Sequence, residues 1–166
     1  MDPNDVRFAA DAMLQLLGKW LRLIGYDCAS DPQLFGRDLV EFALKERRWV
    51  LTRNRRFLGD LPLFLLSRAD IHLIVAEQLA DQVREVEERF SLETNHFVFT
   101  RCLVCNEPLS PVAKSDVTGA VPPQVFARES EFWQCRHCGR TFWRGSHVAH
   151  SLRRLEGWFG NSANSP

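Results

Sequence analysis

"WVLTRNRR", residues 49–56, passes abruptly from apolar to polar and basic side chains. A short run of apolar and β-branched residues bounded by polar ones predicts a buried strand over residues 49–52. The polar residues that follow would leave the sheet at the carboxyl end of that strand. Asn54 stands at this exit, at a position where a carboxylate would be able to bind a metal ion.

Strands and amphipathic helices alternate on both sides of this stretch. The first helix is expected to end at Gly25 and to bury one stripe, formed by Met13, Leu17, Trp20 and Ile24. Further strands are predicted at residues 6–11, 26–30 and 70–76, and helices at residues 12–24, 36–48 and 77–90. A short connection is expected between the strand at 49–52 and the strand at 70–76. This alternation indicates an α/β domain with a parallel sheet.

Three polar residues are predicted to meet at one edge of that sheet. Asp11 ends the first strand, Asp38 opens the second helix, and Asn54 follows the strand at 49–52. In parallel α/β sheets the ligand site lies beyond the carboxyl ends of the strands. Carboxylate oxygens there could hold Mg²⁺ or Mn²⁺, which activates water for phosphodiester hydrolysis. The alternative is that each aspartate caps a helix or lies in a solvated loop.

Charge gives only a local argument for nucleic acid, because the chain has 21 basic and 21 acidic side chains. Arg47, Arg48, Arg53, Arg55 and Arg56 form a dense basic run, and arginine forks suit phosphates. The alternative is a salt-bridged surface, with nearby glutamates as partners. The candidate contacts to a phosphate backbone are Lys19, Arg22, Arg53, Arg55 and Arg56.

Four of the five cysteines form two C-x-x-C pairs, Cys102 with Cys105 and Cys135 with Cys138. Two such turns supply four thiolates in the tetrahedral arrangement that zinc prefers, and four ligands leave no open position, so the ion would be structural. The 29 residues between the pairs exceed the compact spacing of about 15 to 20, which indicates a ribbon with an inserted segment. The fifth, Cys28, is expected to be a small buried residue near a strand.

The composition changes near residues 96–100, where cysteine, tryptophan and histidine become frequent. We therefore expect an α/β domain over residues 1–98, a zinc ribbon over 99–154 and a disordered tail over 155–166. Arginines alternate with Trp133, Phe142 and Trp143 in the ribbon; these aromatic rings could stack on RNA bases or form the ribbon's small core. No apolar run is long enough for a membrane span and no secretory signal is visible, so a cytoplasmic location is expected.

Several motifs in this order resemble the Mut-seven C-terminal RNase family, over about residues 6–150. The matching segments are "RFAADAMLQLLGKWLRLIGYDC", "ERRWVLTRNRRFL", "AEQL", "RCLVCNEPL", "VPPQV" and "EFWQCRHCGRTFWRGSH". The resemblance implies a PIN-like, three-layer α/β/α domain followed by a zinc ribbon, and a metal-dependent ribonuclease activity.

The same resemblance implies the site residues. Asp11 matches the first acid of the family, and Asp38 is the nearest match to the second, with Asp31 as the alternative. The third acid of the family follows "LTR", where this chain has Asn54, and Asp60 is a possible substitute for its charge.

Two functions follow from these observations. In the first, the chain is a metal-dependent endoribonuclease in which Asp11 and Asp38 hold Mg²⁺ or Mn²⁺ and Asn54 is a weak ligand. In the second, Asn54 marks a degenerate site, and the chain is a module that binds RNA or a ribonucleoprotein through its arginines and its ribbon. A weaker third possibility is a ribbon that docks a protein partner. The sequence does not indicate an oligomeric state.

Overall fold

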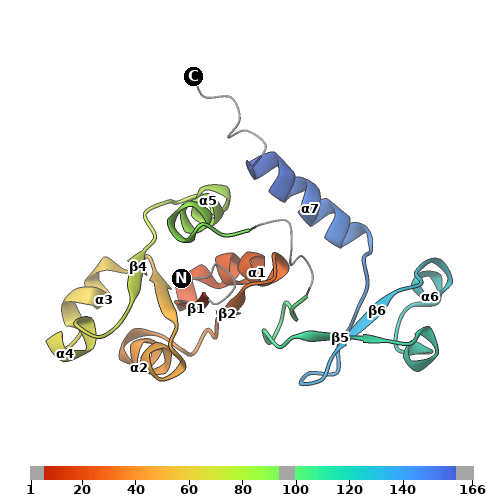
Figure 1. The fold of residues 1–166 in the computed structure, drawn as a ribbon, viewed down its shortest axis with the longest axis horizontal. Coiled ribbons are helices and arrows are strands. Elements are labelled where there is room, and N and C mark those ends of the chain that lie inside the picture. Colours follow the sequence, from red (N-terminus) through yellow and green to blue (C-terminus); the bar gives the residue numbers. More distant parts are fainter. Residues whose placement is uncertain (1–5, 94–99, 160–166) are drawn as a thin grey trace. The chain divides into compact units, whose positions relative to one another are not determined.

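The computed structural model describes residues 6–93 and 100–159. These residues fall into two compact units, one that ends at Asn106 and one that begins at Glu107, and each is described separately (Figure 1).

The first unit contains a four-stranded sheet in which every neighbouring pair of strands is parallel. The strands are β1 (Arg7–Ala10), β2 (Asp27–Ala29), β3 (Trp49–Thr52) and β4 (Ile71–Leu73), in the order β2-β1-β3-β4. The chain moves outward from β1 to β2 and then crosses to the other side of β1 to form β3. The direction of winding therefore changes between β1 and β3, and this point is where α/β proteins of this kind place their ligand sites.

Helices connect the strands as the sequence pattern predicts. They are η2 (Ala12–Leu14), α1 (Gln15–Leu23), α2 (Gly36–Glu46), α3 (Arg55–Asp60), α4 (Leu63–Leu66) and α5 (Leu79–Phe90). The alternation of strands and helices is thus confirmed. The short connection expected between β3 and β4 contains two short helices, α3 and α4, separated at Pro62. Their apolar spacing is too brief to be recognised as helical periodicity.

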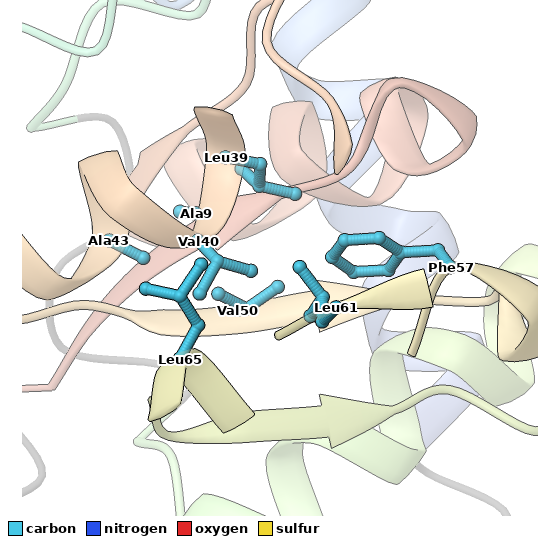
Figure 2. Close-up of a cluster of buried hydrophobic side chains, with 8 residues drawn as sticks. All are labelled: Ala9, Leu39, Val40, Ala43, Val50, Phe57, Leu61 and Leu65. Atoms are coloured by element: carbon cyan, nitrogen blue, oxygen red, sulfur yellow. The ribbon is translucent and has the colours of Figure 1, made fainter. Parts of the chain in front are cut away.

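Helices cover both faces of the sheet, because successive strand residues point to opposite faces. On one face Ala9 and Val50 pack against α2, α3 and α4 in a cluster of buried apolar side chains (Figure 2). On the other face the ring of Phe8 meets the ring of Phe90, from α5, with 5.1 Å between centroids. The predicted α/β/α layering is confirmed.

One predicted core residue lies outside the core. Met13 was expected on the buried stripe of the first helix, but its side chain is 64% exposed. Residues 12–14 form a 3₁₀ turn, so the helical phase that begins at Gln15 does not extend back to Met13. Leu14 occupies the interior position instead and is 1% exposed.

The second unit is built on a small antiparallel sheet, β5 (Leu109–Val112), β6 (Phe132–Cys135) and β7 (Thr141–Phe142). The elements η3 (Lys114–Val117) and α6 (Pro123–Arg128) lie between β5 and β6, and they account for the long interval between the two cysteine pairs. Val117, Val121 and Phe132 form the centre of its core, and Trp143 packs against them. Trp133 and Phe142 are half-buried and pair across β6 and β7.

The boundary expected between residues 98 and 99 falls at the end of a segment outside the described residues, and the two units divide after Asn106. Hydrogen bonds explain why residues 101–106 group with the first unit: Arg22 Nη1 donates to Val104 O over 3.1 Å, and Arg101 Nε donates to Gly25 O over 3.3 Å. Of the expected tail, residues 155–159 continue helix α7 (Ser146–Phe159), while residues 160–166 lie outside the described residues. No helix in the described part of the chain is long and apolar enough to cross a membrane.

Candidate functional site

A buried aspartate lies where β1 ends. The backbone N–H of Asp11 donates to Leu51 O over 2.9 Å, which continues the pairing of β1 with β3. Its side chain turns inward, since the residue is only 5% exposed, and Oδ2 accepts a 2.6 Å hydrogen bond from the hydroxyl of Thr52. Asp11, Thr52 and Asn54 are called the carboxyl edge below.

The Thr52 hydroxyl also connects Asn54 to this network. The backbone N–H of Asn54 donates to Thr52 Oγ1 over 3.0 Å. The side-chain oxygen of Asn54 accepts a 3.2 Å hydrogen bond from the N–H of Phe57, so Asn54 is the N-cap of α3. One amide oxygen has two lone pairs, and the cap occupies one of them. The position is therefore well ordered by local structure, whether or not it also binds an ion.

A cleft of about 530 Å³ opens beside Asn54. Its wall brings together the turn after β1, the start of α2 and the length of α3. Asp60, at the end of α3, lies in the same wall as Asn54, so a carboxylate is present in the cleft although Asn54 brings no charge. The lining residues are Met13, Gly36, Arg37, Asn54, Arg56, Phe57, Asp60 and Leu61.

The other candidate acids, Asp11 included, are not among the residues that line the cleft. Asp38 is exposed in the first turn of α2, one residue beyond Arg37, and lies outside the residues that line the cleft. Asp31 is exposed, and its Oδ1 accepts a 2.8 Å hydrogen bond from the N–H of Gln33, as in an Asx turn. Asp31 thus has the solvated loop position that the alternative interpretation expects, whereas Asp38 is exposed in the first turn of α2 but is not its N-cap, which is Phe35.

The carboxylates of this edge do not form a complete ligand shell on their own. Within residues 6–93 and 100–159, one group of three or more His, Cys, Asp or Glu side chains has its ligand atoms close together, and that group consists of cysteines. Asp11 and its acidic neighbours would therefore offer one ion two carboxylates at most. Mg²⁺ is often bound by one or two carboxylates, with waters and substrate phosphates completing the shell, so the residues present fit such an ion.

The five clustered arginines do not form one patch. Arg47 and Arg48 precede β3, whereas Arg53, Arg55 and Arg56 follow it. Four strand residues at about 3.3 Å each separate the two groups by about 13 Å, at opposite ends of the strand. Only the second group lies beside the carboxyl edge, where Arg55 and Arg56 are exposed.

The two basic residues predicted on α1 differ from each other. Lys19 is exposed. Arg22 is 5% exposed, and its guanidinium donates to Val104 O and to Ser30 Oγ, the latter over 3.0 Å. Burial lowers the pKa of Arg22, while the sulfur atoms of Cys28, Cys102 and Cys105 act in the opposite direction. A guanidinium held in this way faces the first cysteine turn and not a phosphate backbone, so we remove Arg22 from the set of RNA contacts.

The four predicted zinc ligands come together. The sulfur atoms of Cys102, Cys105, Cys135 and Cys138 all lie within 4.8 Å of one another, and they are called the cysteine cluster below. Four soft sulfur ligands at this spacing fit a tetrahedral zinc ion and leave no coordination position for catalysis. The predicted clustering of these four cysteines is confirmed, and their assignment as zinc ligands remains a prediction.

The two cysteine turns share a backbone feature. The N–H of Asn106 donates to Cys102 O over 3.0 Å, and the N–H of Gly139 donates to Cys135 O over 2.9 Å. Both residues have a positive φ, 71° at Asn106 and 69° at Gly139, which asparagine and glycine tolerate better than other residues. Cys28 is outside the cluster and fully buried, and burial raises the pKa of its thiol to about 12, as suits the packing role expected for it.

Sequence reasoning missed two residues that organise these sites. Thr52 was assigned only to the strand, although a hydroxyl at the last position of an apolar strand was a visible signal. Asn106 was not singled out, although it directly follows the C-x-x-C pair as Gly139 follows the second one. Its side chain accepts from the N–H of Cys28 over 3.0 Å and donates to Asp27 Oδ1 over 2.7 Å, which fixes the first turn on β2.

A parallel α/β sheet with helices on both faces, a buried aspartate at its winding switch and a four-cysteine cluster define a three-layer α/β protein with an appended zinc ribbon. The family model of the Mut7-C RNAse domain matches residues 6–155, and the chain belongs to this family. Searches of curated proteins and of solved structures found no significant match.

Proposed function

We propose that the chain is a metal-dependent ribonuclease that hydrolyses RNA phosphodiester bonds at the carboxyl edge. The observation that carries this proposal is the state of Asp11. It is a buried carboxylate at the switch between β1 and β3, and it has no ion pair among the described residues. A buried charge with a single neutral hydrogen-bond partner is costly, and a bound cation would offset that cost.

The hydrogen bonds leave one oxygen of Asp11 for such a cation. Thr52 holds Oδ2, whereas Oδ1 accepts no hydrogen bond within the described parts of the chain. Asp11 would be the fixed ligand, with Asp38 or Asp60 as a second carboxylate and Asn54 as a neutral oxygen donor. A divalent ion bound there supplies an activated water and stabilises the leaving oxygen.

Basic residues beside the edge would hold the RNA. Arg53, Arg55 and Arg56 follow β3 directly, and Lys19 is exposed on α1. Contacts from such residues to phosphates position a strand without reading its sequence. The RNA-binding and cytoplasmic assignments are part of this proposal, and the free thiol and four clustered thiols suit a reducing compartment.

Cleavage of single-stranded RNA in Mn²⁺ tests the proposal, with wild type, Asp11→Asn and Asp116→Asn compared side by side. Asparagine keeps the shape of Asp11 and can still accept from Thr52, so the fold should persist while the ion loses its charged ligand. We expect the rate to fall about a hundredfold or more, since loss of even a supporting group at a metal site costs about 10 to 100-fold. Asp116 is exposed in the second unit and serves as the matched control. Equal cleavage by wild type and Asp11→Asn would exclude this site.

A second candidate function, RNA binding without cleavage, is favoured by one observation. The side-chain oxygen of Asn54 already caps α3, and the amide brings no charge to attract a metal ion. Asn54→Asp separates the two functions, because aspartate caps a helix as well as asparagine does and adds one negative charge. An inert wild type beside an active Asn54→Asp variant would establish the binding module. RNA affinity should then fall steeply between about 50 and 200 mM salt, and the ribbon would be the further surface for RNA or a protein partner.

A further inference from the structure

A second pocket lies at the opposite end of the strands from the carboxyl edge. Its volume is about 410 Å³, within the usual range for pockets that hold small ligands. It opens where β1 and β3 begin, beneath the end of α2, and is called the amino-edge pocket below. Four arginines and one carboxylate face it. The lining residues are Val6, Arg7, Ala43, Leu44, Arg47, Arg48, Trp49, Arg68 and Asp70.

Arg48 is the central residue of this pocket. It is only 9% exposed, and its guanidinium lies over the ring of Phe42, 5.7 Å from the centroid. Among the described residues both of its hydrogen bonds come from Nη1, to Phe8 O over 3.3 Å and to a carboxylate oxygen of Asp27. Nε is buried without a partner. Nε is therefore closed to a ligand, whereas Nη2 makes no hydrogen bond among the described residues and is not buried, so it is the donor of this guanidinium that a ligand can reach.

Asp27 fixes two of the arginines in place. Arg7 Nε donates to Asp27 Oδ2 over 3.2 Å, and Arg7 Nη1 donates to Glu46 O over 3.1 Å. Burial tends to raise the pKa of Asp27, but hydrogen bonds from Arg48 and Asn106 and the charges of Arg48 and Arg101 outweigh it, and the net effect is a lowered pKa. Asp27 therefore stays ionised at neutral pH. Two guanidinium groups are held in fixed geometry before any ligand binds, which reduces the entropy cost of binding.

The other two arginines of the lining, Arg47 and Arg68, add positive charge that the nearby carboxylates do not fully neutralise. Arg47 and Arg68 are exposed and have no ion pair within residues 6–93 and 100–159, while Asp70 is the one carboxylate of the lining. The last turn of α2 contributes a partial negative charge, about half an elementary charge at most. Four guanidinium groups, with Asp27, Glu46 and Asp70 as the nearby carboxylates, still leave the pocket positive.

We propose that the amino-edge pocket binds a phosphate group, carried either by an RNA strand or by a free nucleotide. The free Nη2 donor of Arg48, a second arginine fixed beside it and two exposed arginines at the rim without ion pairs are charged donors of the kind that phosphate oxygens accept from. This inference is independent of cleavage at the carboxyl edge, because it uses none of the residues assigned there.

The experiment measures binding of two probes to the full zinc-loaded chain at constant ionic strength, without added divalent metal. Inorganic pyrophosphate is titrated by calorimetry, and a short fluorescein-labelled single-stranded RNA by fluorescence anisotropy. The variant Arg47→Ala/Arg68→Ala changes only exposed side chains. We expect its Kd to be about tenfold higher, as the loss of a charge-assisted hydrogen bond implies. The control Lys45→Ala/Arg128→Ala removes the same charge from exposed positions outside the pocket and should bind as wild type does.

The two probes distinguish the source of the phosphate. If Arg47→Ala/Arg68→Ala raises the Kd for both probes, the pocket binds the phosphate backbone of RNA. If it raises the Kd for pyrophosphate alone, the ligand is a free nucleotide. If it changes neither Kd, or if the control variant raises them by the same factor, the proposal is overturned. Arg48→Lys keeps the charge but loses the Nη2 donor, so it should also raise the Kd if its melting temperature shows that it is folded. If it does not fold, the double variant at the exposed positions decides the outcome.

Discussion

The cysteine cluster and the carboxyl edge are both candidate metal sites, but the chain builds them in different ways. The cluster consists of four identical soft ligands, brought together by two turns that repeat the same C-x-x-C spacing and the same positive-φ residue. The carboxyl edge has one buried carboxylate, a hydroxyl that holds it, and an amide that also caps a helix. The four cysteines would complete a shell within the protein, whereas an ion at the carboxyl edge would need water and substrate to complete its shell.

The two constructions predict different effects of each site on stability and on activity. A closed shell is occupied whenever the protein is folded, so its metal contributes to the free energy of folding. An open shell binds its ion more weakly, contributes little to stability and leaves positions for a reacting phosphate. Variants of the cluster should therefore unfold structure, whereas variants of the carboxyl edge should change chemistry more than stability.

The largest effect is expected from Cys135→Ser. The remaining three thiolates would bind zinc far less tightly, and structural zinc contributes about 10 to 16 kcal/mol to the folding of small domains. Because the core of the second unit centres on three buried side chains, its sheet should unfold. Metal analysis and amide hydrogen exchange across β5, β6 and β7 are the measurements. Cys28→Ala, which removes a thiol outside the cluster, should retain one zinc per chain. Full zinc occupancy and protected amides in Cys135→Ser would show that the cluster does not support this unit.

A smaller effect is expected from Thr52→Val, which keeps the shape of a fully buried residue and removes its hydroxyl. The hydroxyl bonds both Asp11 and the backbone of Asn54, so its loss leaves a buried carboxylate without its donor. The free energy of unfolding should fall by about 1 to 3 kcal/mol, the cost of an unsatisfied buried group. Urea denaturation measures it, and Mn²⁺ affinity should fall in the same variant. When Thr52→Val is added to Asp11→Asn, it should lower the free energy of unfolding by less than it does in wild type, because no buried carboxylate then loses its donor. An equal loss in wild type and in Asp11→Asn would mean that the hydroxyl does not act through Asp11.

The sequence predicted these two sites unequally, for the same reason that they differ in construction. The clustering of the four cysteines was predicted correctly because each pair depends on local spacing, which a sequence displays directly. The strand at 49–52 was correct to the residue because its apolar run has sharp polar ends. Which acids meet at the carboxyl edge depends on how α2 and α3 pack on the sheet, and this packing is not visible in any local pattern.

The misplacements have physical reasons of the same kind. Arg22 was expected on the surface because charged residues rarely lie inside, but Val104 O in the first cysteine turn and Ser30 Oγ accept from its two Nη atoms, although its Nε has no partner among the described residues. Arg47 and Arg48 were grouped with the arginines after β3 because they are near in sequence, although an extended strand carries its two ends far apart. Long-range contacts decide such positions, and the sequence shows only the side chains that make them.

The next smaller effect is expected where the first cysteine turn is fixed on β2. Asn106→Ala removes two side-chain hydrogen bonds and also places alanine, which tolerates a positive φ less well than asparagine, at a φ of 71°. Asn106→Gly removes the same hydrogen bonds but tolerates that φ, as glycine does at position 139. Both variants should retain zinc, and the lost hydrogen bonds should lower the free energy of unfolding by about 1 to 2 kcal/mol. Asn106→Ala should be about 1 kcal/mol less stable than Asn106→Gly because its backbone is strained. Equal stability of wild type and Asn106→Gly, measured in urea, would show that the side chain does not fix the turn.

The smallest effect is expected from Met13→Ala, at the open edge itself. The side chain lines the cleft and is 64% exposed, so truncating it should change the free energy of unfolding by no more than about 0.5 kcal/mol. The adjacent Leu14→Ala is the matched control: that side chain is 1% exposed, and its truncation should cost about 2 to 5 kcal/mol. A cost above about 2 kcal/mol for Met13→Ala would mean that the first helix buries Met13 after all, as its apolar spacing suggests. A near-neutral change together with weaker RNA binding would place Met13 on the substrate's path and confirm that this edge, unlike the cysteine cluster, is built to stay open.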